Sequence, residues 1–202
     1  IILQKTTYTF DVSVWELFWW SFFGAGLCLL TPGGEKDPAA IIDAVVKYNV
    51  STMHFVPSML DTFLHYLDMQ ESPVHLPSLR QVFASGEALK PEQVTKFNRL
   101  LYESAQTKLI NLYGPTEATV DVSYFNCYGT EKLDRIPIGK PIDNIRLYIL
   151  DRTFHVQPLG AAGQLFIAGV GLARGYLNRP ELTAKKFIAS GGQGGRFLKK
   201  LP

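Results

Sequence analysis

The sequence predicts an α/β protein, in which a parallel sheet flanked by helices is followed by part of a β-rich subdomain. Strand-like and helical patterns alternate along residues 1–121, as is typical of βαβ units in a parallel sheet. After about Val120 the helical patterns give way to short β-rich runs separated by glycine and proline turns. We therefore assign residues 1–121 to a parallel α/β subdomain and residues 122–188 to an incomplete β-rich subdomain.

The elements of the first subdomain follow from hydrophobic periodicity and from helix start signals. A helix is expected over residues 13–23, and a strand over residues 26–30 is ended by a Thr-Pro-Gly-Gly turn. Helical spacing behind Pro38 predicts a helix over residues 38–48. The remaining expected elements are strands over residues 52–56, 81–84 and 108–112 and helices over residues 58–67 and 91–102. This order is typical of a flavodoxin-like subdomain.

The second part of the chain is predicted to be mostly antiparallel. Strands are expected over residues 122–127, 146–150 and 164–168, and a last helix over residues 180–188. The tail, residues 189–202, contains a glycine-rich run and is expected to be atypical and disordered.

Composition excludes several classes of function. With 202 residues, 47% of them hydrophobic and 19% charged, the chain can bury a globular core. A net charge of +2, with no basic run interleaved with aromatics, argues against a nucleic-acid partner. The apolar residues 15–30 are short for a membrane span and contain Glu16, so no membrane association is expected. Two unpaired cysteines favour a reduced, cytoplasmic location, and the scattered histidines show no metal-ligand spacing.

The most informative motif is NLYGPTE at residues 111–117, directly after an expected strand. It presents an aromatic ring, a hydroxyl and a carboxylate at the carboxyl end of a strand, where open α/β sheets bind ligands. The ring of Tyr113 suits a purine, the hydroxyl of Thr116 suits a phosphate oxygen, and the carboxylate of Glu117 suits Mg²⁺. An ordinary tight turn is the alternative interpretation.

Three further segments carry candidate chemistry. Asp11 lies just ahead of an intensely apolar helix; its alternative role is helix capping, by Asp11 or by Ser13 with Glu16 completing a capping box. The Ser-Gly-Glu-Ala run at residues 85–88 lies between a strand and a helix, as a nucleotide-edge loop or a plain connection would. The glycine-rich segment at residues 163–183 would, alone, indicate only turns.

Together and in this order, the four segments resemble the adenylation domains of nonribosomal peptide synthetases, within the AMP-binding superfamily of adenylate-forming enzymes. The resemblance runs from about Thr9 to Phe187 and is carried mainly by NLYGPTEATVD and GVGLARGYLNRPELT. It implies an ATP-dependent ligase of secondary metabolism, in which a carboxylate attacks the α-phosphorus of Mg·ATP to give an acyl-adenylate and pyrophosphate. The acyl group then passes to the phosphopantetheine thiol of a carrier protein. The implied partners are the peptidyl carrier and condensation domains of the same synthetase.

The resemblance also implies roles for individual residues. Tyr113 would stack on adenine, Thr116 would contact the phosphate and Glu117 would bind Mg²⁺, which makes Thr116 and Glu117 the catalytic residues. The full set implied to bind ATP is Gly86, Glu87, Ala88, Asn111, Tyr113, Gly114 and Thr116.

A pocket for the amino acid is implied as well. Its lining residues are Asp11, Val12, Trp15, His54, Phe83, Ser85, Leu112, Val120 and Asp121. Asp11 would pair with the α-ammonium group, and five of the others would form apolar walls. The polar remainder, His54, Ser85 and Asp121, calls for a substrate hydroxyl and resembles the serine-selecting pattern, with threonine as the second choice. A satisfied core histidine at His54 and a turn cap at Asp121 remain the alternatives.

Two other functions compete with amino-acid activation. An acyl- or aryl-CoA ligase of the same superfamily is disfavoured by Asp11, because its substrates carry no α-ammonium group. A non-catalytic nucleotide-binding remnant is the second. The lysine-bearing phosphate loop, the ribose-binding aspartate and the C-terminal lysine domain of the family are not found, so we expect an internal fragment that is inactive by itself.

Overall fold

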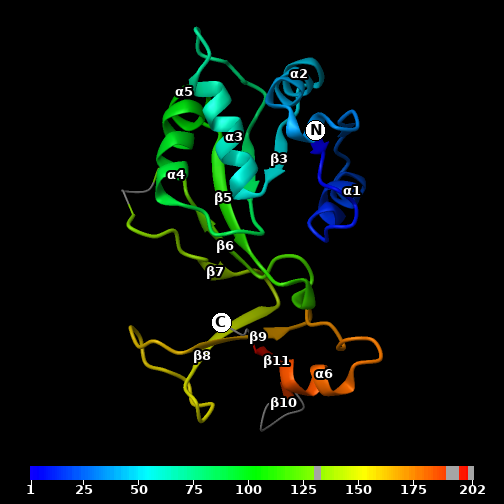
Figure 1. The fold of residues 1–202 in the computed structure, drawn as a ribbon, viewed down its shortest axis with the longest axis vertical. Coiled ribbons are helices and arrows are strands. Elements are labelled where there is room, and N and C mark those ends of the chain that lie inside the picture. The colour runs from blue at the N-terminus through cyan, green and yellow to red at the C-terminus, as the bar shows by residue number, and fades with distance from the viewer. Residues whose placement is uncertain (130–132, 190–195, 200–202) are drawn as a thin grey trace. The chain divides into compact units, whose positions relative to one another are not determined.

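The computed structural model describes residues 1–129, 133–189 and 196–199, and the chain divides into two compact units (Figure 1). The first unit contains residues 1–113 and 124–139, and the second contains residues 114–123 and 140–202. The single boundary expected between residues 121 and 122 therefore differs from this division. The reason is that β6 (Ser123–Asn126) returns to lie beside β5 (Lys108–Tyr113) in the first sheet.

The first unit contains a sheet whose strands follow the order β2-β1-β3-β4-β5-β6. The pairings among β1 (Ile2–Gln4), β2 (Leu27–Leu29), β3 (Thr52–Phe55), β4 (Gln81–Ala84) and β5 are parallel. In the register of β3 and β4, His54 lies opposite Phe83. The predicted parallel α/β class is confirmed, and its strands place two of the candidate pocket residues, His54 and Phe83, side by side.

Helices flank this sheet, and proline marks the start of several of them. They are α1 (Ser13–Phe22), α2 (Pro38–Tyr48), α3 (Pro57–Asp68), α4 (Pro91–Phe97) and α5 (Glu103–Ala105), with a short 3₁₀ turn η1 (Gly34–Lys36) before α2. Figure 1 shows α3 next to α4, and α1 beside the N-terminal strand. The helix expected over residues 91–102 differs in one respect, because its second half is the π-helical turn η2 (Asn98–Tyr102).

The core of the first unit consists of the apolar side chains that the sheet and its helices share. The rings of Phe55 and Phe63, from β3 and α3, lie 5.0 Å apart between their centroids, and both are buried. Leu3, Val45, Met53, Val82 and Leu109 are also fully buried within this cluster. Burial of this kind supplies most of the favourable free energy of folding, and it fixes the strands whose ends carry the candidate site.

The start of α1 differs from the capping arrangement considered from the sequence. Val12 is the N-cap residue, and no side chain caps the helix there. Glu16 instead accepts hydrogen bonds from the backbone N–H groups of Lys5 and Thr6, at 3.2 and 2.9 Å, and from the Thr6 hydroxyl at 2.7 Å. Glu16 is fully buried, so this carboxylate ties α1 to the segment that follows β1. The capping-box alternative is therefore wrong, because the Glu16 carboxylate binds donors from Lys5 and Thr6 and does not cap its own helix.

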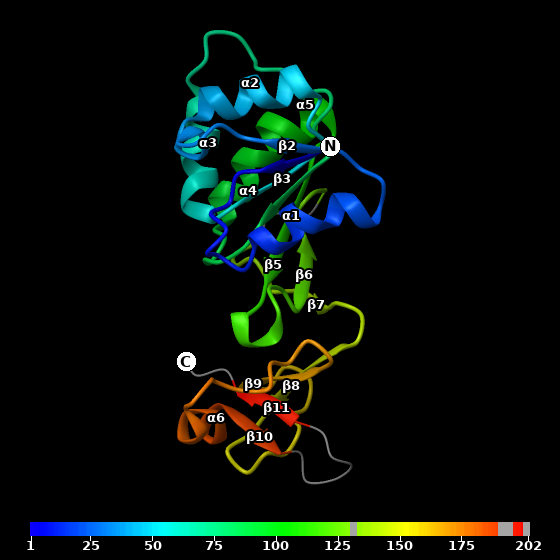
Figure 2. The same ribbon diagram turned by 90° about the vertical axis from the view of Figure 1, so that its right-hand side faces the viewer.

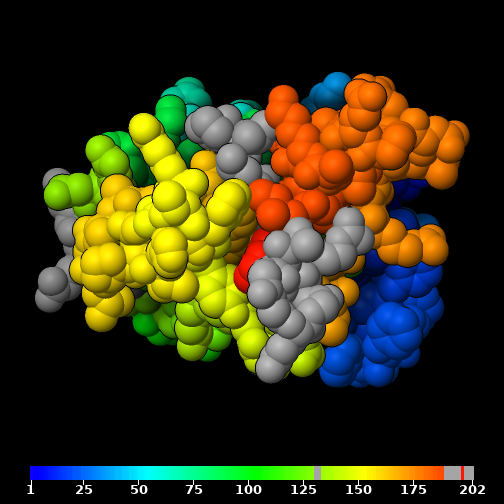
Figure 3. Space-filling model, turned by 90° about the horizontal axis from the view of Figure 1, so that it is seen from below, coloured from blue at the N-terminus to red at the C-terminus, as the bar shows by residue number. Residues whose placement is uncertain are grey.

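The second unit is built around an antiparallel sheet (Figure 2). Its strand order is β10-β11-β9-β8, formed by β8 (Ile145–Leu150), β9 (Gln164–Gly169), β10 (Phe187–Ala189) and β11 (Arg196–Lys199). The unit also contains the 3₁₀ turn η3 (Thr116–Ala118), the short strand β7 (Lys140–Pro141) and the helix α6 (Pro180–Lys186). In Figure 3, α6 in orange-red and the β8 region in yellow lie on either side of one face of this unit.

The end of the chain departs from the sequence prediction in two places. The helix expected over residues 180–188 ends at Lys186, and Phe187 begins strand β10. Part of the tail expected to be disordered forms β11, which pairs antiparallel with both β10 and β9. The ring of Phe197 on β11 packs at 5.4 Å from Tyr148, so aromatic contacts stabilise this strand. Residues 190–195 and 200–202 lie outside the described part of the chain.

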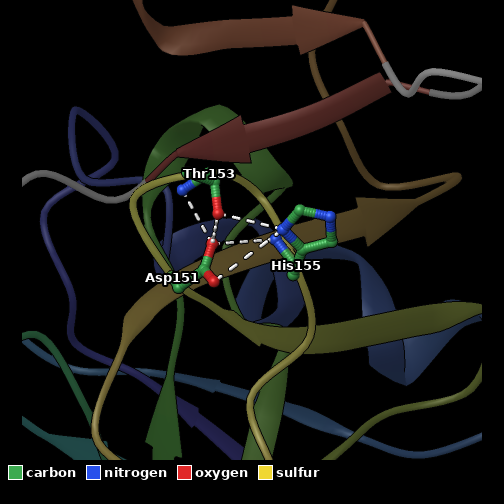
Figure 4. A network of polar contacts seen from close by, with 3 residues as sticks. All are labelled: Asp151, Thr153 and His155. Carbon is green, nitrogen blue, oxygen red and sulfur yellow. Dashed lines mark hydrogen bonds and ion pairs between the residues drawn. The ribbon is translucent and has the colours of Figure 1, made fainter.

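A polar network closes the turn after β8 (Figure 4). The Asp151 carboxylate accepts hydrogen bonds from the backbone N–H and hydroxyl of Thr153 and from the backbone N–H of His155, at 2.7 to 2.9 Å. The His155 backbone hydrogen bond is the largest cause that lowers the pKa of Asp151. Aspartate, threonine and histidine could suggest a catalytic triad, but the network is local and the imidazole is exposed. It has the properties of an Asx turn.

Candidate active site

The beginning of α1 carries the proposed ammonium-binding carboxylate. Asp11 is half-buried in the turn that leads into α1, where its carbonyl accepts a hydrogen bond from Val14 N–H at 3.0 Å. Within the described residues its carboxylate has no hydrogen bond and no ion pair. Val12 beside it is buried. The carboxylate is therefore available to a cationic ligand, and it contributes no hydrogen bond to the fold.

One turn further along α1, Trp15 belongs to an aromatic cluster. Its ring centroid lies 5.4 Å from Phe83 and 6.3 Å from His54, in edge-to-face geometry in both pairs. Trp19 extends the cluster, with its centroid 5.7 Å from Trp15. The indole Nε1 of Trp15 is buried and has no hydrogen-bond acceptor among the described residues. A buried donor without an acceptor is costly, so this N–H favours an acceptor group supplied from outside the described residues.

His54 and Ser85 form a buried hydrogen-bonded pair at neighbouring strand ends. The His54 Nε2 atom lies 2.9 Å from the Ser85 Oγ, and both residues are 1% exposed. Burial is the main cause that lowers the pKa of His54 to about 3, so the imidazole is neutral at physiological pH. His54 thus has a partner within the protein, as the core-histidine alternative expects. The pair still places polar atoms beside Trp15 and Phe83.

The end of β5 holds a second group of predicted residues. Asn111 is buried, and its Nδ2 donates to the Pro137 carbonyl at 2.9 Å, so its side chain fixes the segment around Pro137. Leu112 and Tyr113 are half-buried. The structure therefore gives the Asn111 amide an internal role in addition to the adenine-edge role predicted for it.

The loop after β4 has an internal role too. The Glu87 carboxylate accepts hydrogen bonds from the Ser58 N–H at 2.9 Å and from the Ser58 hydroxyl at 3.1 Å, at the start of α3. Gly86 has a φ of 89°, a left-handed conformation that favours glycine. Gly86, Glu87 and Ala88 are exposed. The Glu87 side chain thus holds this loop against α3, while the loop backbone stays accessible.

In the second unit, the carboxylate predicted to bind Mg²⁺ has a tyrosine partner. Thr116 is exposed and Glu117 is half-buried on the turn η3. The Tyr176 hydroxyl donates a hydrogen bond to Glu117 Oε1, and Ala173 N–H donates to the Glu117 carbonyl at 2.8 Å. Burial first, and the hydrogen bond to Glu117 second, raise the pKa of Tyr176 to about 12, so this hydroxyl remains a donor at physiological pH.

The turn around η3 has a tightly constrained backbone. A Cβ atom at Gly114 would lie 2.9 Å from the backbone nitrogen of Asp121, so only glycine fits at this position. Thr119 and Val120 both have positive φ, at 63° and 69°. Val120 and Asp121 are half-buried. This conformation explains why the motif contains glycine directly after the tyrosine.

A comparison with protein-family models shows which family the chain belongs to. The model described as AMP-binding enzyme matches residues 1–177. The chain belongs to the AMP-binding enzyme family. The matched range includes every predicted site residue in both units.

Several bacterial synthases contain a region that is similar to this AMP-binding chain. It is 57% identical over 190 residues to one of the proteins that make up the mycosubtilin synthase of Bacillus subtilis, a match that covers 93% of the chain and 7% of that protein. It is 54% identical over 188 residues to zwittermicin A synthase ZmaJ of Bacillus cereus, a match that covers 93% of the chain and 36% of that protein. The chain therefore spans well under half the length of these relatives.

Solved structures of similar fold include a nonribosomal peptide synthetase. A crystal structure of the nonribosomal peptide synthetase FmoA3 superposes with a TM-score of 0.87 at 28% identity, covering 98% of the chain and 21% of FmoA3. An AMPPNP-bound form gives the same values. The α-methyl-L-serine-AMP-bound form gives a TM-score of 0.83 at 27% identity, over 98% of the chain and 22% of FmoA3.

Two kinds of feature are absent from the described residues of this AMP-binding chain. No group of three or more histidine, cysteine, aspartate or glutamate side chains could hold a metal ion there. None of the helices described is long and apolar enough to cross a membrane.

Sequence reasoning missed one residue that contacts the candidate site. Tyr176 lies within the GVGLARGYLNRPELT motif, but the motif alone predicts no role for its side chain. Its hydrogen bond to Glu117 joins residues that are 59 positions apart in the sequence. The sequence shows only that the two motifs follow each other in the chain. Their order does not show which side chains of the two motifs are in contact.

Proposed function

We propose that this chain is part of an amino-acid adenylation domain that activates serine with ATP, giving seryl-adenylate and pyrophosphate. Threonine, which is one methyl group larger, is the second candidate. The observation that carries the proposal is the unpartnered Asp11 carboxylate at the start of α1, the helix that places Trp15 against His54 and Phe83. A carboxylate beside an apolar aromatic cluster suits a ligand with an ammonium group and a small side chain.

The ammonium group of the amino acid is the partner proposed for Asp11. A charge-assisted hydrogen bond in a half-buried site is stronger than one between exposed groups. The same contact disfavours the acyl- or aryl-CoA ligase alternative, because those substrates would leave the Asp11 carboxylate without a cation. The described part of the chain offers Asp11 no other cation.

The hydroxyl of serine is the second feature proposed to be recognised. Apolar surfaces from Val12, Trp15, Phe83, Leu112 and Val120 would enclose the side chain, and the polar groups of His54, Ser85 and Asp121 would select the hydroxyl. The buried His54–Ser85 pair and the unsatisfied Trp15 N–H both supply polar atoms in that cluster. The bound form of FmoA3 with α-methyl-L-serine-AMP supports a serine-like substrate. A site built around a hydroxyl strongly rejects analogues without one.

ATP and Mg²⁺ are proposed to bind around the NLYGPTE motif. Tyr113 offers an aromatic face for adenine, Gly86 and Ala88 are exposed in the loop after β4, and Thr116 offers an exposed hydroxyl. Gly114 allows the tight turn between Tyr113 and Thr116, because the backbone of Asp121 leaves no room for a side chain there. Mg²⁺ usually takes one or two protein carboxylates and completes its coordination with water and phosphate oxygens. Glu117 fits this requirement, because Tyr176 engages only its Oε1. The AMPPNP-bound form of FmoA3 supports nucleotide binding.

The reaction proposed is a substitution at phosphorus. The substrate carboxylate oxygen forms a bond to the α-phosphorus, and the bond to the pyrophosphate oxygen breaks. The residues would act by positioning and by neutralising charge. Thr116 would donate to a phosphate oxygen, and Glu117 would hold Mg²⁺, which offsets the negative charge of the phosphates. In the full-length protein, the phosphopantetheine thiol of a peptidyl carrier domain would then attack the acyl carbon, forming a thioester as the bond to the phosphate oxygen breaks and AMP leaves. A condensation domain would be the next partner.

Amino-acid-dependent ATP–pyrophosphate exchange tests this proposal in the full-length protein. A panel of amino acids and of carboxylic acids without an α-ammonium group should show the greatest exchange with serine and weaker exchange with threonine. Preference for a large hydrophobic amino acid would contradict the pocket assignment. Exchange supported equally by acids without an ammonium group would favour the CoA-ligase alternative.

A further inference from the structure

A tyrosine holds the carboxylate proposed to bind Mg²⁺. The Tyr176 hydroxyl donates to Glu117 Oε1, and both residues belong to the second unit. Among the hydrogen bonds described, this is the only one that the Glu117 carboxylate accepts. A carboxylate that has one oxygen fixed presents the other in a restricted direction, which is how outer ligands orient metal-binding groups.

The backbone around Glu117 is tied to the same loop. Ala173 N–H donates to the Glu117 carbonyl at 2.8 Å, and the Thr119 hydroxyl donates to the Gly171 carbonyl at 2.6 Å. These bonds join the η3 turn to residues 171–173 independently of the Tyr176 side chain. Removing the tyrosine hydroxyl should therefore leave the turn in place and release only the carboxylate.

Tyr176 itself is held firmly by α6 and β10. Its backbone N–H donates to the Thr183 hydroxyl at 2.9 Å, and its ring lies 5.9 Å from that of Phe187. A Cβ at Gly175 would lie 2.8 Å from the Thr183 hydroxyl oxygen, so glycine is required for this close approach. The GYLNRPELT segment therefore forms a rigid base for the tyrosine side chain.

We infer that Tyr176 is a positioning residue that orients the Glu117 carboxylate for cation binding. This inference rests on the proposed function, because it takes Glu117 as the Mg²⁺ ligand. The inference adds a role for the glycine-rich segment around residues 171–179, which would support Glu117 through the Tyr176 hydroxyl. The role is distinct from catalysis, since Tyr176 acts through Glu117.

The test compares Tyr176→Phe with Glu117→Gln in the full-length protein. Tyr148→Phe is the matched control, because it removes a hydroxyl from the same unit that has no hydrogen bond among the described residues. The first measurement is the affinity for Mn²⁺ in the presence of AMPPNP, determined by electron paramagnetic resonance. It reports cation binding without turnover. The Mg²⁺ concentration for half-maximal pyrophosphate exchange is the second measurement.

Tyr176→Phe should weaken Mn²⁺ affinity by roughly 10-fold, the lower limit usual for removing an outer partner of a metal ligand. Tyr148→Phe should match the wild type. The double variant with Glu117→Gln should bind Mn²⁺ no more weakly than Glu117→Gln alone, because Tyr176 acts through that carboxylate. A purely structural role for Tyr176 would instead give additive losses in the double variant and overturn the inference.

Two further outcomes separate this inference from the proposed function. If Glu117→Gln weakens Mn²⁺ binding and Tyr176→Phe leaves it unchanged, the positioning role is wrong while the metal role stands. If Glu117→Gln itself leaves Mn²⁺ binding unchanged, the metal role within the proposed function is wrong, and the positioning role is overturned with it.

Discussion

The imidazole of His54 is hydrogen-bonded to the hydroxyl of Ser85, 2.9 Å away, inside the sheet of the first unit. His54 lies near the carboxyl end of β3, Ser85 directly follows β4, and each residue is 1% exposed. The pair thus has two possible roles. Its hydrogen bond satisfies two buried polar groups in the core, and it places polar atoms beside the rings of Trp15 and Phe83. Its two roles can be separated by experiment.

The structural role of His54 predicts a specific dependence of stability on pH. Its pKa is about 3 in the folded protein, against an ordinary value near 6.5, so the unfolded chain binds the proton more readily. Stability is therefore present above pH 6.5 and is lost as the pH falls toward 3. Between pH 8 and pH 5 this group alone should lower the free energy of unfolding by about 2 kcal/mol.

Urea unfolding followed by tryptophan fluorescence at pH 5 to 8 measures this loss. His54→Gln should flatten the pH dependence by that amount, whereas the exposed His155→Gln should leave it as in the wild type. An identical pH dependence in the wild type and in His54→Gln would contradict the assignment of a buried neutral imidazole.

A second prediction concerns Glu16, whose carboxylate is buried beneath the segment after β1. Glu16→Ala removes the acceptor for two backbone N–H groups and the Thr6 hydroxyl. Leaving such donors unsatisfied should lower the free energy of unfolding by about 2–3 kcal/mol. Chemical denaturation gives the value, with the exposed Glu71→Ala as the control. Equal stability of Glu16→Ala and the wild type would show that these contacts contribute nothing.

Asp11 is predicted to serve the substrate and not the fold. In the full-length protein Asp11→Ala should abolish amino-acid activation, because losing one partner of a charge pair that the bound substrate would bury costs about 2–5 kcal/mol. ATP binding and melting temperature should stay near wild-type values. Asp37→Ala is the opposite control, since Asp37 caps α2 by accepting from Ala39 N–H at 2.9 Å. It should lower stability by about 1 kcal/mol and leave activity per folded molecule unchanged.

The outcome that opposes the ammonium role of Asp11 is equally clear. If Asp11→Ala lowers the melting temperature while activity per folded molecule is retained, Asp11 is a structural residue at the start of α1.

Selectivity for the hydroxyl predicts a difference between serine and alanine. Asp121→Ala should leave the serine hydroxyl short of a hydrogen-bond partner, a penalty of about 1–3 kcal/mol that alanine does not experience. The serine-to-alanine ratio of pyrophosphate exchange should fall roughly 10- to 100-fold. Equal losses for both amino acids would mean that Asp121 shapes the turn after η3 and does not read the substrate.

Local signals in the sequence predicted much of the fold. The bounds of α2 were predicted from Pro38 at its start and from the helical spacing of its apolar residues. The structure adds that Asp37 caps the helix and that Asn49 ends it in a left-handed conformation with a φ of 52°. Strand β4 was likewise predicted at its observed bounds. Both depend on residues within or next to the element, so no knowledge of distant contacts was required.

The errors occurred where distant residues decide the structure. The apparent capping box at Ser13 and Glu16 is replaced by contacts from Glu16 to Lys5 and Thr6, about ten residues earlier. The expected last helix gives way to β10 at Phe187 because β11 is available for pairing. The discontinuous units arise because β6 rejoins the first sheet. None of these tertiary partners leaves a periodic signal in the sequence.

For the candidate site too, local motifs could be recognised from the sequence, whereas contacts between distant residues could not. Motif order was enough to assign the family, and the family match includes all the candidate site residues named from the sequence. The hydrogen bonds of Asn111, Glu87 and Glu117 with Pro137, Ser58 and Tyr176 required coordinates. Sequence reasoning therefore named candidate positions for the site but not the contacts that hold their side chains.

The most direct test of serine activation is to trap the product in a competition. The full-length protein is incubated with Mg·ATP, hydroxylamine and an equimolar mixture of serine, threonine, alanine and phenylalanine, and the amino-acid hydroxamates are quantified by mass spectrometry. Serine hydroxamate should dominate, threonine hydroxamate should come second, and Asp11→Ala should produce neither. Phenylalanine hydroxamate as the main product, or equal amounts from serine and alanine, would contradict the serine assignment.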